Sequence, residues 1–339
     1  MVWGPDRLPN QPIILGDGTL PLVESCKHVG VTLTTSSRAA KAGVATRVGT
    51  GTKTLLAARG IGSPSVPVTP AVLSKLYWSV AVPRSLYGLE VTPITDSGME
   101  ELEKMHRNNA RIVQGLPHNV PLPAPLATLG WMSMKSHLAM TKMLFMWRVL
   151  CMDQNNIYRK VMIIMLKLII KNEIQKVKMP SSPVSDMYRC IKMYKLDGAL
   201  REGLLNGNFG KFEEWKKFIK NTVWQVEKMK WKCTCMLYKT LACYSQNVHE
   251  IRMHAWWYLA KDAPHLTKKI ACVMSLLMGS QPSGLQKNNN SSRCKLCDNQ
   301  AADTPTHIIF ECETLQDVRA TWWAKVMNKL PLALANDFG

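Results

Sequence analysis

Four residues near the carboxyl terminus have the types and spacing of a zinc site: Cys294, Cys297, His307 and Cys312. They form the pattern Cys-x2-Cys-x9-His-x4-Cys, and we call them the Cys3His cluster. Zinc prefers four thiolate and imidazole ligands in a tetrahedron, and a two-residue gap lets one turn aim both thiolates at the same ion. Because four protein ligands leave no position for a catalytic water, the pattern predicts one structural zinc ion. The competing interpretation is three unrelated thiols and a surface histidine.

The spacing of the last two ligands constrains the backbone between them. His307 and Cys312 are five residues apart, and on a continuous α-helix with about 3.6 residues per turn they would diverge by about 140°. A helix in this segment must therefore end or distort. Its expected start has Thr304 as the N-cap and Pro305 at the first helical position, where a missing N–H does no harm.

Length and composition place the chain among folded proteins of a reducing compartment. At 339 residues with 46% apolar residues, it is long enough for two domains with real cores. Its ten cysteines are too sparse and irregular for a disulfide scaffold, and the first twenty residues lack the apolar core of a secretory signal. We therefore expect an intracellular location, in the cytoplasm, the nucleus or both. The longest apolar run, 161–170, is too short to cross a bilayer, which needs about 20 residues, so no membrane span is expected.

The charge balance favours a polyanionic partner. Forty-three lysines and arginines against 24 acidic residues give a net charge of +19 and a pI near 9.6. An anionic membrane would attract the same charge, but it usually does so through one compact basic cluster, whereas here the excess is spread along the chain. Nucleic acid is therefore the expected partner, and no membrane partner is expected.

The periodicity predicts a mainly α-helical fold that follows a small N-terminal β-strand region and ends in the zinc module. Strand patterns occur at 12–15, 20–23 and 28–33. Helical patterns occur at 38–59, from Pro70 until Pro83 kinks or ends the helix, and at 97–114, 133–151 and 157–177. After the Cys3His cluster, a closing amphipathic helix is expected to bury Leu315, Val318, Trp322, Val326 and Leu330.

The segment 97–114 has the strongest helical pattern. Ser97 and Glu100 form a capping box, and Gly115 is the expected stop. The stripe expected to face the core consists of Met99, Leu102, His106 and Val113. We expect the histidine of this stripe to be packed or hydrogen-bonded.

Two groups of basic residues are candidates for phosphate contacts. The first is a stripe on the 97–114 helix: Lys104, Arg107 and Arg111. The second lies in 211–239, where eight lysines alternate with aromatic residues that could stack on bases, and its candidates are Lys216, Lys217 and Lys220. The alternative is that both groups are solvated faces, the second on a helix that buries its aromatic residues.

Several short motifs occur in a fixed order along the chain. The first five are 28–33 (HVGVTL), 76–77 (LY), 82–91 (VPRSLYGLEV), 99–117 ending in QGLP, and 126–131 ending in LGW. The last four are 278–279 (MG), 294–297 (CKLC), 306–309 (THII) and Cys312. Each motif alone is weak, but the ordered set is specific. It resembles the C-terminal half of a non-LTR (LINE-type) retrotransposon reverse transcriptase, with the weakest match at 180–265.

This resemblance implies four segments. Residues 1–35 would be a remnant of the palm edge, 36–180 a thumb-like helical domain, 181–285 a helical basic and aromatic region, and 286–339 the zinc-binding segment with its closing helix. The thumb helices would grip the template–primer duplex, and the zinc segment would help bind the element's RNA or target DNA. The strands of the first 40 or so residues are expected to be poorly supported, because they would lack the palm sheet.

The chain departs from the family at the catalytic centre. A polymerase needs clustered carboxylates that hold two metal ions about 3.5 to 4 Å apart. No Asp-Asp pair occurs here, and the only acidic residues before the thumb-like region are Asp6, Asp17 and Glu24. The fingers and most of the palm would precede Met1, and the 27 residues after Cys312 are too few for a nuclease domain. We therefore expect no catalytic residues and no activity from this chain alone.

Three functional hypotheses follow. The first is a non-catalytic, nucleic-acid-binding fragment of a reverse transcriptase, with RNA or a primer–template duplex as its partner. The second is a zinc-containing interaction or structural protein, derived from a retroelement, that binds another protein. The third is a polymerase that becomes active when another chain supplies the palm. The sequence leaves the oligomeric state open.

Overall fold

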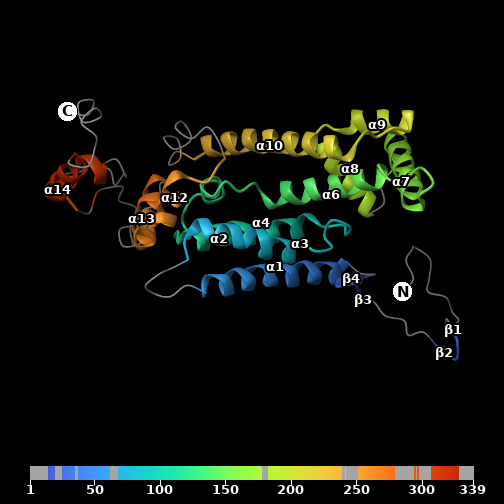
Figure 1. Cartoon of the computed structure of the whole chain (residues 1–339), viewed down its shortest axis with the longest axis horizontal. Helices are drawn as coiled ribbons and strands as arrows, with labels where there is room; N and C mark the ends of the chain where they lie inside the picture. The colour runs from blue at the N-terminus through green and yellow to red at the C-terminus, as the bar shows by residue number, and fades with distance from the viewer. Residues whose placement is uncertain are drawn as a thin grey trace.

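The computed structural model describes residues 14–19, 25–34, 37–61, 68–177, 182–238, 241, 251–278, 294, 296–297 and 307–327. These residues are mainly helical, which confirms the predicted fold class at this level. Four long helices lie along the longest axis of the molecule in the order α1, α4, α6 and α10 (Figure 1). Their bounds are Ser37–Arg59, Asp96–Gln114, Met134–Leu150 and Phe212–Met236.

The other helices pack around these four. Before α4 come α2 (Pro70–Leu76), the π-helical turn η1 (Tyr77–Ala81) and α3 (Val82–Leu86). Between α4 and α10 come α5 (Ala124–Ala127), α7 (Ile157–Ile174), α8 (Pro183–Met193) and α9 (Asp197–Asn206). After α10 come α12 (Ala255–Asp262), the 3-10 turn η3 (Pro264–Leu266) and α13 (Thr267–Leu277). No helix in the described part of the chain is long and apolar enough to cross a membrane.

The described strands form two separate antiparallel pairs. β1 (Ile14–Leu15) pairs with β2 (Gly18–Thr19), and β3 (Ser25–His28) pairs with β4 (Val31–Thr34). The prediction of one strand over 28–33 is therefore wrong. Val29 and Gly30 have φ angles of 48° and 76°, and two successive positive values form the tight hairpin turn that suits the twist of paired strands. The predicted strand at 20–23 lies outside the described residues.

The hairpin of β3 and β4 is tied to the helices. The guanidinium of Arg47 donates to the carbonyl of Gly30 at 2.6 Å, and the hydroxyl of Tyr87 donates to the carbonyl of Val29 at 2.9 Å. Arg47 also lies 5.3 Å from the centre of the Tyr87 ring, within cation–π range. The expectation of poor support is therefore wrong for this hairpin, because its turn carbonyls find donors on α1 and after α3.

Helix α4 starts and stops at specific residues. Its N-cap is Thr95, in an extended conformation, and the Thr95 hydroxyl accepts from the backbone N–H of Gly98 at 3.2 Å. The predicted cap at Ser97 is wrong, because Ser97 already lies within the first helical turn. Gly115 ends the helix with a left-handed φ of 65°, as predicted, because glycine takes this conformation without a Cβ clash.

A π-helical turn carries the chain past Pro83. The backbone N–H of Val82 donates to the carbonyl of Tyr77, five residues earlier, in η1. Because Pro83 has no N–H, it cannot donate the next hydrogen bond of a regular α-helix. The wider turn before it lets the helix continue past this missing bond. The helix therefore changes geometry before Pro83 and ends at Leu86.

Two hydrophobic cores share α6 and α10. The first is built from α1 to α5, the end of α10, α12 and α13, and the second from α6 to α9 and the start of α10. Leu138 belongs to the first core and Met143 to the second, while α10 contributes Val223 to the second and Trp231 to the first. The predicted segments 36–180 and 181–285 thus each supply residues to both cores, and the four-segment division remains a prediction.

A ring stack in the first core contains the predicted packed histidine. Tyr77 and Trp131 stack with their ring centres 4.4 Å apart, and the His106 ring lies 5.2 Å from Trp131. Nε2 of His106 is 3.0 Å from the carbonyl of Met132, and its Nδ1 is 2.8 Å from the hydroxyl of Tyr77. Because a carbonyl only accepts, Nε2 carries the proton and the tyrosine donates to Nδ1. The prediction of a packed, hydrogen-bonded His106 is confirmed.

A second polar network fastens α12 to α4. The side-chain oxygen of Gln114 accepts from the hydroxyl of Thr128 at 2.6 Å and from the indole N–H of Trp257 at 3.0 Å. Nearby, Leu129 and Met253 form an isolated antiparallel bridge. Gly130 has a φ of 71°, and a Cβ there would lie 2.7 Å from the backbone nitrogen of Met253. Only glycine allows this close approach of the two chain segments.

The first prediction concerns His106. Burial lowers the pKa of His106 from 6.5 to about 3 in the folded chain. Between these values the unfolded chain binds one proton more, so this group reduces stability as the pH falls from about 6.5 to about 3, by up to about 1.4 kcal/mol per pH unit. His106→Gln should be less stable at pH 7 and should show a shallower fall on acidification, as measured by urea unfolding at several pH values. A slope unchanged from that of the unsubstituted chain would contradict the assignment.

The second prediction compares two glycines. Gly130→Ala should lower the free energy of unfolding by more than about 1 kcal/mol, because the new methyl group meets backbone and the φ is left-handed. Gly43→Ala is the matched control, since Gly43 lies inside α1 with no atom within 4 Å of the added Cβ. That substitution should stabilise the chain by up to about 1 kcal/mol. Equal effects in urea unfolding would refute the close-approach argument.

Candidate metal centre and basic surface

The structure brings the four residues of the Cys3His cluster together. Their ligand atoms all lie within 4.8 Å of one another. Cys294, His307 and Cys312 are buried, and Cys297 is half-buried. Ligand atoms around a tetrahedral ion with bonds of about 2.0 to 2.3 Å lie roughly 3.3 to 3.8 Å apart, so a small contraction would complete the site. The cluster could therefore hold one metal ion.

A π-helical turn places the last two ligands, His307 and Cys312, on the same side of the chain. The turn η4 covers His307–Glu311, and the backbone N–H of Cys312 donates to the carbonyl of His307 at 2.6 Å. This bond spans five residues instead of four, so the wider turn returns residue 312 to the side of residue 307. The predicted distortion of the helix is confirmed. Its predicted start at Thr304 and Pro305 lies outside the described residues.

The two nitrogens of His307 have different neighbours. Nε2 lies 3.2 Å from the sulfur of Cys297 and therefore faces the thiols. Nδ1 lies 3.6 Å from a carboxylate oxygen of Glu311, one turn further along. A metal-binding histidine commonly has a carboxylate beside its other nitrogen, which fixes the ring orientation and raises the basicity of the ligand. Glu311 is in the position to do this for His307.

The thiols of the cluster have unequal pKa values. Burial raises the pKa of Cys294, but hydrogen bonds from the backbone N–H groups of Leu296 and Cys297, together with those from the side chains of Cys297 and His307, bring the pKa down to about 7. Burial and the neighbouring thiols of Cys294 and Cys312 raise the pKa of Cys297 to about 11. Adjacent thiolates repel one another, so a cation among them favours the fully ionised set.

The two halves of the cluster are joined by the segment that follows it. The hydroxyl of Thr314, in the 3-10 turn η5 (Glu313–Leu315), donates to the carbonyl of Leu296. Arg319, in α14 (Gln316–Met327), donates to the carbonyl of Cys312 at 2.9 Å. These bonds connect the Cys294–Cys297 turn with η4, η5 and α14, and we call the set the metal module.

The closing helix forms, but its apolar residues are not buried as predicted. Val318 is 65% exposed and Trp322 is 54% exposed. Helix α14 packs on η4 and η5 and lies at one end of the molecule, beyond α13 (Figure 1). Two short turns offer too little surface to cover a whole helix face. The side chain of Val326 and all of Leu330 lie outside the described structure.

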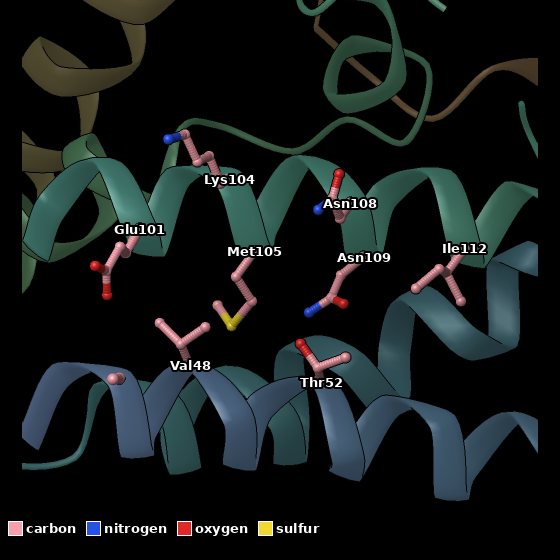
Figure 2. Close-up of a pocket in the computed structure, with 9 residues that line it drawn as sticks. Val48, Thr52, Glu101, Lys104, Met105, Asn108, Asn109 and Ile112 are labelled. Carbon is pink, nitrogen blue, oxygen red and sulfur yellow. The ribbon is translucent and has the colours of Figure 1, made fainter. Parts of the chain in front are cut away.

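The three basic residues predicted on α4 have different roles. Arg107 pairs with Glu100 at 2.7 Å. Arg111 is half-buried, donates to the carbonyl of Val120 at 3.0 Å, and has its pKa lowered by burial. Lys104 is exposed beside a pocket between α1 and α4, and Figure 2 shows it pointing away from α1. The three side chains therefore do not form one free basic stripe.

Helix α10 carries a longer basic stripe than the sequence indicated. Lys216 pairs with Glu213 at 3.1 Å, whereas Lys217 and Lys220 are exposed. Continuing from these two at helical spacing gives the full α10 basic stripe, which consists of Lys217, Lys220, Trp224, Lys228 and Lys232. In the described structure none of its four lysines forms an ion pair. The signal for its last two lysines was their spacing from Trp224, because Lys228 and Lys232 follow it at successive intervals of four residues.

The aromatic residues of α10 are largely used for packing. Trp231 is buried and donates to the carbonyl of Pro123 at 3.2 Å, and Trp215 packs against Trp147 with ring centres 3.9 Å apart and ring planes tilted by 39°. Trp224 is half-buried against the first core and lies within the row of lysines. The helix thus packs most of its aromatic residues against the cores, as the alternative interpretation held, but Phe218 is 48% exposed beside the exposed Lys217.

The third prediction concerns the metal. The protein should carry one tightly bound divalent ion, detected by native mass spectrometry, and Cys312→Ser should lose it. Because binding and local folding are coupled, that variant should also become protease-sensitive between residues 294 and 327 while both cores stay protected. Cys233→Ser, at an exposed thiol on α10, should keep the ion. Loss of the ion from both variants, or its absence from the unsubstituted chain, would contradict the site.

Comparisons of the chain with protein-family models, with curated proteins and with solved structures found no match.

Proposed function

We propose that this chain is a nucleic-acid-binding helical protein with one structural zinc ion, related to the C-terminal part of a non-LTR retrotransposon reverse transcriptase. The observation that carries the proposal is the net charge of +19 together with the lysines of the α10 basic stripe, none of which pairs with an acidic residue in the described part of the chain. The partner would be RNA or a primer–template duplex inside the cell. This chain alone would hold nucleic acid without catalysing its synthesis.

The donor set supports zinc as the ion. Three cysteines and one histidine offer soft thiolate and imidazole ligands, whereas magnesium and calcium prefer oxygen. All four positions of a tetrahedron are filled by protein, so the ion has no open position for water or substrate. Its role would be to hold Cys294 and Cys297 against η4 and α14. The ion in the native mass measurement above should therefore be zinc.

The α10 basic stripe supports the nucleic-acid partner. From Lys217 to Lys232 it follows the helix for about 22 Å, at about 1.5 Å per residue. Lysines along such a line neutralise successive phosphates and release their counterions, which drives binding. The accessible part of Trp224 lies among them and offers a ring on which a base could stack. Lys104 lies on another helix and is a separate candidate contact.

The packing of the motif residues supports the relationship to reverse transcriptases. Tyr77, Gln114 and Trp131 come from three different motifs of the resemblance, and all three lie in the buried polar networks of the first core. Tyr87, from a fourth motif, contacts the carbonyl of Val29 in the first motif. Motifs that converge in one packed unit are expected if they were inherited as a unit. The thumb and palm-edge assignments belong to this proposal.

The fourth prediction tests the α10 basic stripe. The chain should bind a short structured RNA, and the logarithm of the affinity should fall linearly with the logarithm of salt concentration. Lys217→Ala and Lys220→Ala, made separately, should each weaken binding and reduce that slope by about one unit, because each variant neutralises one phosphate fewer. Fluorescence anisotropy at several salt concentrations measures both quantities.

The matched control is Lys75→Ala, at an exposed lysine on α2 outside the stripe. It should change the affinity and the slope much less than either stripe substitution. Equal effects at all three lysines would mean that binding follows net charge and has no site on α10. Affinity that does not change between low and moderate salt would refute nucleic-acid binding itself.

A further inference from the structure

Helix α7 is apolar on two opposite faces. One face buries Met162, Leu166 and Ile169 against α6 and α8. The other face leaves four large apolar residues in solvent: Ile157 at 63%, Val161 at 50%, Ile164 at 57% and Leu168 at 50% exposure. A helix that is apolar all round normally lies inside a structure. In Figure 1, however, α7 lies at one end of the molecule, so its outer face has no described neighbour to cover it.

The four exposed residues have the spacing of a helix–helix seam, and we call them the α7 seam. They follow one another at intervals of four, three and four residues, which is the a and d pattern of two heptads. This pattern confines them to a narrow stripe on the helix surface. A helix that lies on a membrane presents a broad apolar face, whereas a narrow stripe receives one partner helix.

Positive charges line one side of the α7 seam. Lys160 and Lys167 each precede a seam residue and occupy the flanking g positions of the two heptads, and both are exposed. Neither forms an ion pair with any described residue. The single acidic residue of α7, Glu173, is held elsewhere by Lys192 and Arg201. The flank therefore attracts a partner with acidic residues beside its own apolar stripe.

Hydrogen bonds at both ends of α7 hold this helix against the rest of the fold. Arg159 donates to the carbonyls of Met152 and Gly207, each at 2.9 Å. At the other end of the helix, the hydroxyl of Tyr188 on α8 donates to Glu173 at 2.7 Å. A helix fixed at both ends loses little conformational freedom when a partner binds.

We propose that the α7 seam docks an amphipathic helix of another protein, one with an apolar a and d stripe and acidic flanks. A second copy of this chain fits less well, because each copy carries a charge of +19 and an antiparallel pair would bring the lysines of the two g positions together. The proposal goes beyond nucleic-acid binding and does not depend on it, since the seam and the α10 basic stripe lie on different helices.

The fifth prediction uses a synthetic probe of defined sequence. The probe is a labelled three-heptad peptide with isoleucine at a, leucine at d and glutamate at e and g, and fluorescence anisotropy measures its binding to the full chain. Leu168→Glu should weaken binding by about tenfold or more, because it places a charge inside the apolar contact. The matched control is Leu205→Glu, which makes the same change at a residue of α9 that is 86% exposed and lies outside α7. It should leave the affinity nearly unchanged, and circular dichroism should show equal helix content in both variants.

A charge reversal tests the flank. A second peptide with lysine in place of glutamate should bind the unsubstituted chain at least about tenfold more weakly. Lys160→Glu with Lys167→Glu should reverse this preference. The proposal is overturned if the glutamate peptide does not bind, if both glutamate variants lower its affinity equally, or if the charge reversal leaves the preference unchanged. It is also overturned if Leu168→Glu abolishes self-association in sedimentation, or binding to phosphatidylserine vesicles, because either result gives the seam a different occupant.

Discussion

The stacked rings of Tyr77, Trp131 and His106 hold together three stretches of chain that are far apart in sequence. Tyr77 lies in the π turn before Pro83, His106 lies in the middle of α4, and Trp131 lies in the segment that leads into α6. Each polar atom that the stack buries has a partner, since Tyr77 donates to His106, His106 donates to the carbonyl of Met132, and Trp131 donates to Ser74. Buried polar groups specify an arrangement only when all are satisfied, because an unpaired one costs about 1 to 3 kcal/mol. The stack therefore fixes the relative positions of α2, α4 and the start of α6.

Helices α6 and α10 connect this ring stack in the first core to the second core. Lys142 on α6 is buried and pairs with Asp186 on α8, and Glu227 on α10 accepts from the hydroxyl of Ser133 at 2.7 Å. Two long helices that pass through both cores make it hard for one core to move without the other. This rigidity matters for the two surfaces of interest, because the α10 basic stripe and the α7 seam both lie on helices whose opposite faces are buried in these cores. A surface presented in this way needs little ordering when it binds.

The parts of the structure that the sequence predicted are those decided by local chemistry. The Cys3His cluster was predictable because ligand type and spacing are local, and the distorted turn followed from helix geometry alone. The stop at Gly115 is likewise local. The hydrogen bond from Arg111 to the carbonyl of Val120 could not be predicted, because that carbonyl is brought to the side chain only by the fold of the following loop. The α7 seam was overlooked because apolar residues on two faces of a helix give the same composition as one well-packed helix, and only burial separates the faces.

The metal module and the helical cores depend on different sources of stability. In the cores, large residues such as Trp147 and Trp257 are completely buried, and the hydrophobic effect supplies most of the stabilisation. Among the side chains that the structure describes in the module, Val318 and Trp322 remain mostly exposed, whereas Cys294, His307 and Cys312 are buried. Burying these polar groups side by side is unfavourable unless an ion binds them, because the thiolates repel one another. Since a short segment with little apolar burial cannot offset its own conformational entropy, metal binding is the interaction that can fold it.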